Sequence, residues 1–298
     1  MNLAVGRPGG LAVWTMLASL TARPPDRLTA QSQPSIASLT GSTRSAGLAG
    51  AGVALVGDAG SMFANPAGLA TIRGVALEGS YAFYPAGVTA SSVAAAVRVG
   101  HFNYGLAGLM RRPDDATSQP SDVLALSSIV YRFGMIALGA SVKYVREGAA
   151  APQVESWAGD AGVAIALFDI LALGASVQNL GGDLSAGAPL AHRTRVGLTM
   201  NFVDPQGTAR LCTTLEGQWP EGQPSVLVAG AEGGFVTRGI GIVARVGVSG
   251  AAAANNQAPF ALGAGVSLGR FRIDYAYRAL EMPSGAVHRI GVRWGKWK

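Results

Sequence analysis

The stretch "RTRVGLTMNF", Arg193 to Phe202, alternates strictly between two kinds of residue. One set reads Thr, Val, Leu, Met, Phe and the other reads Arg, Arg, Gly, Thr, Asn. Because successive side chains of a β-strand point to opposite faces, the first set would share an apolar face and the second a polar one. The same period of two returns in "LALGASVQ", Leu171 to Gln178, and in "FRIDYAYRA", Phe271 to Ala279. The sequence therefore predicts two-faced strands.

The composition favours a membrane protein. Of the 298 residues, 49% are hydrophobic and only 13% are charged, whereas soluble proteins average about 25% charged residues. No clean run of about 20 apolar residues is present, as a spanning helix would need. The closest run, Ala161 to Val177, carries Asp169 at its centre, where a carboxylate is costly in lipid. The remaining way to cross a bilayer is a closed β-barrel, in which every backbone group is paired.

About fourteen strands can be counted from Gly74 to the C-terminus, with the lengths usual for membrane barrels. They are predicted at 74–84, 90–99, 101–111, 122–133, 135–146, 156–167, 171–180, 192–203, 209–219, 224–236, 240–249, 260–268, 270–280 and 286–295. Tight connections alternate with longer ones such as 113–121 and 179–191. Outer-membrane barrels have this arrangement, and a soluble sandwich has no reason for it. We expect the tight turns and the N-terminus to be periplasmic and the long connections to face outside.

The aromatic residues are predicted to form two interfacial girdles, as in membrane barrels. Those near the tight turns are Phe102, Tyr104, Phe133, Phe168, Phe202, Phe235, Phe271 and Trp294. Those near the longer connections are Phe83, Tyr144, Trp157, Trp219, Phe260 and Tyr277. Aromatic residues that filled a soluble core would instead scatter along the strand middles.

Three parts follow along the chain. Residues 1–30 are predicted to be a signal peptide, in which Arg7 precedes an apolar run and cleavage falls near Ala22 or Ala30. Residues 31–73 are predicted to be a plug, and residues 74–298 the barrel.

The plug is expected because a barrel of about fourteen strands has a lumen too wide for its own side chains to fill. "GAGVALVGDAGSMFANPAGLA", Gly50 to Ala70, is apolar and glycine-rich and directly precedes the first strand. Asp58 is expected to cap a short helix, and Asn65 to bond locally where Pro66 begins another. Met62, Phe63 and Leu69 are the expected apolar gate. The predicted plug residues are Asp58, Met62, Phe63, Asn65, Pro66, Gly68 and Leu69. The alternative is a disordered periplasmic tail.

Strand parity directs polar side chains of both charge signs into the lumen. These residues are Glu78, Arg98, Lys143, Asp160, Gln178, Arg195, Glu216, Arg245, Asp274, Arg289 and Arg293. Such groups can pair across the interior and hold plug and wall together.

Several motifs together resemble the PorV/PorQ family of outer-membrane proteins, which are relatives of the FadL-type fatty-acid transporters. They are "STRSAGLAGAGVALVGDAGSMFANPAGLA" before a barrel, "LGASVQNLGG" in the middle, and "FRIDYAYRALEMPSGAVHRIGVRW" at the end. The resemblance implies a fourteen-stranded barrel with an N-terminal segment in its lumen. It implies an accessory or attachment role in type IX-like protein secretion, or, as in FadL-type relatives, passage of hydrophobic small molecules.

An enzyme is not expected, although outer-membrane lipid hydrolases are a less favoured alternative. His101, His192 and His288 have no partner at metal or triad spacing, and Cys212 is a single cysteine. No metal or cofactor is therefore expected. The net charge of +6 is scattered without a basic run, which favours contact with lipid headgroups over nucleic acid. We expect a monomeric barrel whose partners are outer-membrane lipid and either secretion proteins or a hydrophobic ligand.

Overall fold

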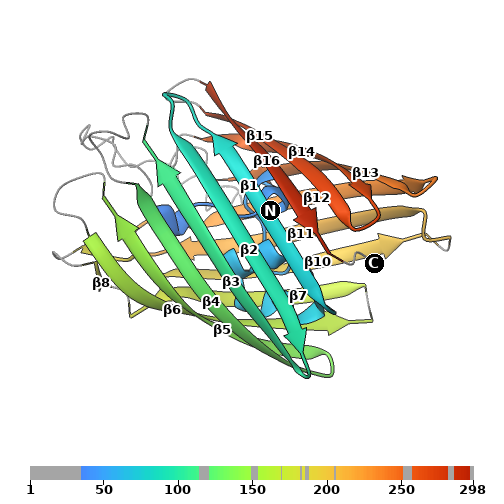
Figure 1. The fold of residues 1–298 in the computed structure, drawn as a ribbon, viewed down its shortest axis with the longest axis horizontal. Helices are drawn as coiled ribbons and strands as arrows, with labels where there is room; N and C mark the ends of the chain where they lie inside the picture. Colours follow the sequence, from blue (N-terminus) through green and yellow to red (C-terminus); the bar gives the residue numbers. More distant parts are fainter. Residues whose placement is uncertain are drawn as a thin grey trace, which may run out of the picture. The chain divides into compact units, whose positions relative to one another are not determined.

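The computed structural model describes residues 35–113, 121–148, 154–168, 170–181, 183–184, 188–204, 206–250, 257–280 and 285–295. The predicted signal peptide and the first residues assigned to the plug lie outside these ranges. Fourteen antiparallel strands close into a barrel in which each strand pairs with its neighbours along the chain, and β1 closes on β16 (Figure 1). The fold is all-β, as predicted.

The barrel strands lie within three residues of the predicted bounds. They are β1 (Val75–Phe83), β2 (Thr89–Val99), β3 (Phe102–Arg112), β4 (Asp122–Phe133), β5 (Ile136–Glu147), β6 (Val154–Leu167), β7 (Leu171–Leu180), β10 (Arg193–Val203), β11 (Ala209–Pro220), β12 (Val226–Thr237), β13 (Ile240–Ser249), β14 (Gln257–Leu268), β15 (Phe271–Leu280) and β16 (Gly285–Trp294). A separate two-stranded ribbon, β8 (Asp183–Leu184) and β9 (Ala188–Pro189), stands in the longest connection.

The two ends of the barrel differ in their connections. At one end the strands join through short turns, such as 100–101, 134–135, 238–239 and 269–270. Gly100, Gly134, Gly239 and Gly269 have positive φ there, which glycine adopts without steric cost. The opposite end carries the longer connections between strands and is called the loop end below.

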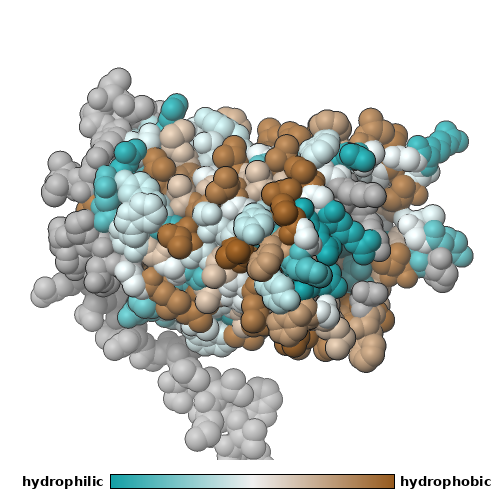
Figure 2. All heavy atoms as spheres, turned by 60° about the horizontal axis from the view of Figure 1, so that its bottom comes forward, coloured by the Kyte–Doolittle hydropathy of each residue, from teal (hydrophilic) through white to brown (hydrophobic). Residues whose placement is uncertain are grey.

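The outward face of the wall is apolar. Val93, Leu106 and Trp157 are each about two-thirds exposed, at 65%, 66% and 67%, and Figure 2 shows apolar residues spread over the barrel wall. Residues that alternate with them are buried, as in β13, where burial changes at every residue. Most of the predicted girdle residues lie exposed on this face, whereas Tyr144, Tyr277 and Trp294 are half-buried. The apolar set therefore faces lipid and the polar set faces the lumen.

No helix in the described ranges is both long and apolar enough to cross a membrane.

The described chain begins with an inner segment, residues 35–73, made of four short helical turns and their links. They are η1 (Ile36–Ser38), α1 (Thr43–Gly47), η2 (Ala59–Phe63) and η3 (Pro66–Thr71). Residues of the segment contact strands on opposite sides of the barrel, including β3, β5, β7, β12 and β16. Figure 1 shows it, in blue, between the front and back strands. The segment therefore lies in the lumen.

The direction of the inner segment differs from expectation. Ser35 Oγ and the Ile36 amide both donate to Glu147 Oε1, at 2.6 Å each, and Glu147 is the last residue of β5 at the loop end. We expected the N-terminus at the end with the tight turns. The described chain instead starts at the loop end and runs through the lumen to the first residue of β1. The half-buried carboxylate of Glu147 holds the start of the described chain there.

Local sequence explains most of the turns within this segment. Asn65 accepts a hydrogen bond from the Ala67 amide, 2.9 Å away, and Pro66 occupies the first position of η3, where its missing N–H costs nothing. Asp58 precedes η2, but its side chain makes no capping hydrogen bond. The predicted cap is therefore wrong, because guanidinium groups compete for this carboxylate, as described below.

Candidate functional site

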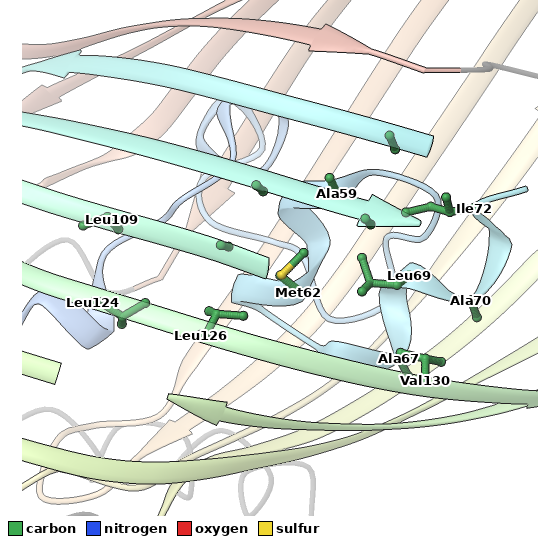
Figure 3. Close-up of a cluster of buried hydrophobic side chains, with 14 of the residues drawn as sticks. Ala59, Met62, Ala67, Leu69, Ala70, Ile72, Leu109, Leu124, Leu126 and Val130 are labelled. Carbon is green, nitrogen blue, oxygen red and sulfur yellow. The ribbon is translucent and has the colours of Figure 1, made fainter. Parts of the chain in front are cut away.

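One side of the inner segment packs an apolar surface against the wall formed by β2 to β6. Met62 and Leu69 are fully buried, and Figure 3 shows both of them among Leu126, Val130 and other wall residues. Phe63 is only half-buried and packs at the edge of this cluster. The structure thus brings two of the three predicted gate residues together in an apolar contact without a charged group.

Glycines in the wall allow the inner segment to approach unusually closely. A Cβ at Gly139 of β5 would lie 2.5 Å from the Ala67 nitrogen, and one at Gly174 of β7 would lie 2.2 Å from the Val53 oxygen. Gly162 and Gly247 face Asn65 and Leu48 in the same way. No side chain fits at these points, because real Cβ contacts are essentially never that short. The wall is therefore shaped to the backbone of the inner segment.

Polar wall side chains bind the backbone of the inner segment on the apolar side as well. Asn103 of β3 donates to the carbonyl oxygens of Leu69 and Ile72, both at 2.8 Å. Ser176 of β7 donates to the Ala64 oxygen at 2.8 Å. These bonds hold the backbone at the ends of η2 and η3 against the wall.

The opposite side of the inner segment is joined to the wall by a closed ring of six alternating charges. Arg44 of α1 pairs with Asp58 at 2.7 Å and with Glu232 of β12 at 2.9 Å. Arg245 of β13 pairs with Glu232 and with Asp274 of β15, both at 2.6 Å. Arg293 of β16 closes the ring, bonding Asp274 at 2.7 Å and Asp58 at 2.5 Å. We call these residues the ion ring: Arg44, Asp58, Arg293, Asp274, Arg245 and Glu232.

Every member of the ion ring is buried, with at most 6% of its surface exposed. Burial alone would raise the pKa of Asp58, but the guanidinium charges of Arg293 and Arg44 outweigh it and hold that pKa well below its usual range. The ionised form of Asp58 is therefore favoured in the folded protein. Each charge has two opposite neighbours, so that removal of one member leaves two others underpaired.

A second polar clamp holds the link between α1 and η2. Glu216 of β11 accepts from the amides of Gly52 and Val53 through Oε2, at 2.7 and 2.8 Å. Its other oxygen accepts from Arg195 Nε at 2.6 Å, and Arg195 in turn donates to the Gly50 carbonyl at 2.7 Å. The apolar and glycine-rich link is thus held by charge-assisted bonds, which are stronger than neutral ones.

The remaining predicted lumen residues are buried on the inner face, with one exception. Lys143 pairs with Asp160 across β5 and β6 at 2.7 Å, and Gln178 donates to the Phe63 carbonyl at 2.9 Å. Glu78 accepts from the Gly60 amide at 3.0 Å. Arg98 is exposed and bonds only its own turn, at the Gly100 carbonyl. Arg98 is on the lumen face of β2, but it lies at the strand end next to a tight turn, where solvent reaches it.

Three residues of this site were not predicted from the sequence. Arg44 was not distinguished from other residues of the N-terminal segment, and Glu232 lies in the glycine-rich stretch "AEGGF", whose alternation is weak. Asn103 follows a tight turn and reads as an ordinary polar strand residue. Glu232 and Asn103 could have been predicted, because both alternate with outward-facing residues and so point into the lumen. Nothing in the local sequence indicates which residues pair with Arg44.

The fold has clear relatives among solved structures. The Ralstonia pickettii toluene transporter TbuX matches with a TM-score of 0.56 at 13% identity, over 85% of this chain and 97% of that chain. A TodX deletion mutant, described as a monoaromatic hydrocarbon channel, gives 0.58 at 11% identity over 85% and 98%. A Pseudomonas aeruginosa FadL homologue gives 0.53 at 13% identity over 85% and 98%. The sequence itself matches no protein-family model and no curated protein.

At these identities the likeness establishes the fold. The chain is a closed β-barrel of FadL-like fold, and its outward face is apolar, as in barrels of the Gram-negative outer membrane.

Proposed function

We propose that the barrel is a channel for small hydrophobic molecules and that the inner segment keeps it shut. The observation that carries the proposal is the fit of the inner segment to the wall, in which glycines on β5, β6, β7 and β13 admit its backbone. The solved relatives described as toluene and monoaromatic hydrocarbon channels support this choice of solute. A segment fitted so closely occupies the space through which a solute would pass.

Passage requires part of the inner segment to move. Against β2 to β6, η2 and η3 make apolar packing contacts and neutral hydrogen bonds, whereas on the other side the ion ring holds Arg44 of α1 and Asp58. Buried ion pairs are costly to separate, because each charge would be left alone. We therefore place the movable part at η2 and η3, with Met62 and Leu69 as the apolar gate.

A reversible lock across this gate tests the proposal. A Cβ at Gly105 of β3 would lie 2.6 Å from Leu69 Cδ1, so that Leu69→Cys and Gly105→Cys place two thiols next to each other. The double variant, made with Cys212→Ser, is expressed in a Gram-negative host without channels of this fold, and the uptake of labelled toluene is measured. Oxidation is expected to reduce uptake to the level of cells without the protein, and a reductant to restore it. The two single-cysteine variants serve as controls, and the oxidant should not change their toluene uptake.

If uptake by the reduced double variant and by the unaltered chain equals that of cells without the protein, the channel proposal fails.

A role in protein secretion is the second candidate, because the N-terminal and closing-strand motifs resemble the PorV/PorQ family. It predicts that removing the chain from its own host impairs the surface attachment of exported proteins. Unchanged attachment would contradict this role and would leave the channel proposal untouched.

We also propose that the chain is not an enzyme. Among the described residues, no three His, Cys, Asp or Glu side chains gather as a metal site would need. His288 faces outward and bonds the Tyr275 hydroxyl at 2.7 Å. Purified protein is expected to leave lipid esters intact, and sustained hydrolysis would contradict the proposal.

A further inference from the structure

A cavity of about 160 Å³ lies between the inner segment and the loop end of the barrel. Strand ends form its rim, including Pro220 of β11 and Ser249 of β13, and α1 with its neighbours forms its floor. The cavity is separate from the apolar gate, since Met62 and Leu69 do not line it. A solute that enters from the loop end would meet it before the inner segment.

The charges that line this cavity are strongly unbalanced. Among the described residues, five arginines and a single carboxylate, that of Asp58, line it. The lining arginines are Arg44, Arg193, Arg195, Arg278 and Arg289. Asp58 pairs with Arg44 and Arg293 in the ion ring, and Arg195 pairs with Glu216, so that neither carboxylate is left for the other three arginines.

Three of these arginines have no carboxylate within ion-pair distance among the residues that the structure describes: Arg193, Arg278 and Arg289. Arg289 is 3% exposed and donates from Nη1 to the Ser80 hydroxyl at 2.9 Å. Arg278 donates from Nε to the Ala258 carbonyl at 3.1 Å. Neutral acceptors leave the full positive charge of each guanidinium uncompensated.

The arginines also stand close enough to act on one ligand. In the register of β15 and β16, Arg278 lies opposite Val287 and Arg289 lies opposite Ala276. The two arginines are therefore diagonal neighbours on the inner face, a spacing that long side chains bridge. Arg193 and Arg195 stand two residues apart on β10 and line the same cavity from another wall.

We propose that this cavity is a binding site for a phosphate group. Planar guanidinium forks bind phosphate oxygens in pairs, and charge-assisted bonds are strongest in a recess with little water. A neutral hydrocarbon would leave the arginines without counter-charge. The site goes beyond the proposed channel, because binding there needs no transport. The phosphate is either free or carried by a lipid headgroup.

The test uses the purified, folded full-length chain in a neutral detergent at low ionic strength. Isothermal titration is carried out with inorganic phosphate and with dihexanoyl phosphatidic acid below its micelle concentration, and dihexanoylglycerol is the uncharged control. We expect saturable binding of at least one phosphate probe and none of the uncharged control. The pair Arg278→Gln and Arg289→Gln should weaken binding at least about tenfold, as loss of charge-assisted bonds implies. Arg193→Gln should weaken it from the other wall.

The matched control removes two arginines at the opposite end of the barrel. Arg98 and Arg132 are exposed and bond only their own turns, at Gly100 and Gly134. Arg98→Gln with Arg132→Gln should leave binding unchanged. Heat-modifiable migration on gels verifies that every variant is a folded barrel.

The outcomes distinguish free phosphate from a lipid headgroup as the ligand, and they distinguish failure of the phosphate site from failure of the channel proposal. Binding of inorganic phosphate supports a free-anion site, and binding of phosphatidic acid alone supports a headgroup site. Failure of both probes to bind the folded chain overturns the proposal, as does equal weakening by the cavity variants and the control variants. Toluene uptake measured on the same proteins reports on the channel separately, so that one proposal can fail without the other.

Discussion

The inner segment meets the barrel on two surfaces of opposite chemistry. Toward β2 to β6 it presents Met62, Leu69 and small residues to an apolar wall, and toward β12 to β16 it presents Arg44 and Asp58 to buried charges. Apolar packing is the sum of many weak contacts and can be lost by degrees. A closed ring of buried charges cannot be lost by degrees, since each charge depends on both neighbours. For the proposed channel, this difference predicts that the charged side anchors the inner segment and that the apolar side moves.

The largest expected effect comes from breaking the ion ring. Asp58→Asn removes one charge and leaves Arg44 and Arg293 underpaired, which costs about 3–5 kcal/mol for a buried pair. The inner segment should then leave the wall, and frequent channel openings should appear in planar bilayers. Asp204→Asn is the control, because Asp204 lies half-buried in a tight turn outside the lumen, where it accepts hydrogen bonds from Thr208 and Ala209. If Asp58→Asn opens no more often than the unaltered chain in these recordings, the ion ring is not the anchor.

Truncating the apolar gate should have a smaller effect. Leu69→Ala leaves a cavity at a fully buried position and should cost about 2–5 kcal/mol, depending on how far the site collapses. We expect short, partial openings in the same bilayer recordings, with α1 still anchored. Openings as large and as long as those of Asp58→Asn would contradict the distinction between the two surfaces.

A single added methyl group tests the close fit on the apolar side. At Gly139 a Cβ would overlap the start of η3, whereas at Gly159 it would meet only ordinary contacts, 3.6 Å from the nearest atom. Gly139→Ala should therefore destabilise the closed state by about 1–3 kcal/mol, as overpacking does. Gly159→Ala should behave as the unaltered chain. Equal opening frequencies for the two variants would contradict the fit.

The smallest expected effect is that of pH. The pKa of Asp58 is lowered in the folded protein. The stabilisation from its charge is therefore fully present above the pKa of an aspartate in the unfolded chain, about 3.9. It is lost only as the pH falls through the lowered pKa of the folded protein. Opening frequency should not change between pH 8 and pH 5. A rise within this window would show that a group other than Asp58 limits the anchor.

The barrel was predictable because its signal is local. Alternation places Arg195, Glu216 and Arg245 on the inner face wherever a strand is recognised, and connection length distinguishes the two ends. The apolar residues Met62 and Leu69 were found because a buried segment needs an apolar face. The ion ring was not predictable, since its six members come from five separate elements and the link before η2, and their meeting depends on how the inner segment folds back. The same competition for Asp58 removed the predicted helix cap.

Single-channel conductance after removal of residues 42–70 tests the central claim most directly. The deletion removes α1, η2 and nearly all of η3 and leaves every barrel strand intact. Heat-modifiable migration must first show that the barrel is folded. We predict a large, steady conductance, because a barrel of about fourteen strands has an open lumen without its inner segment. A folded deletion barrel that conducts no more than the full-length chain would contradict the claim that this segment closes the channel.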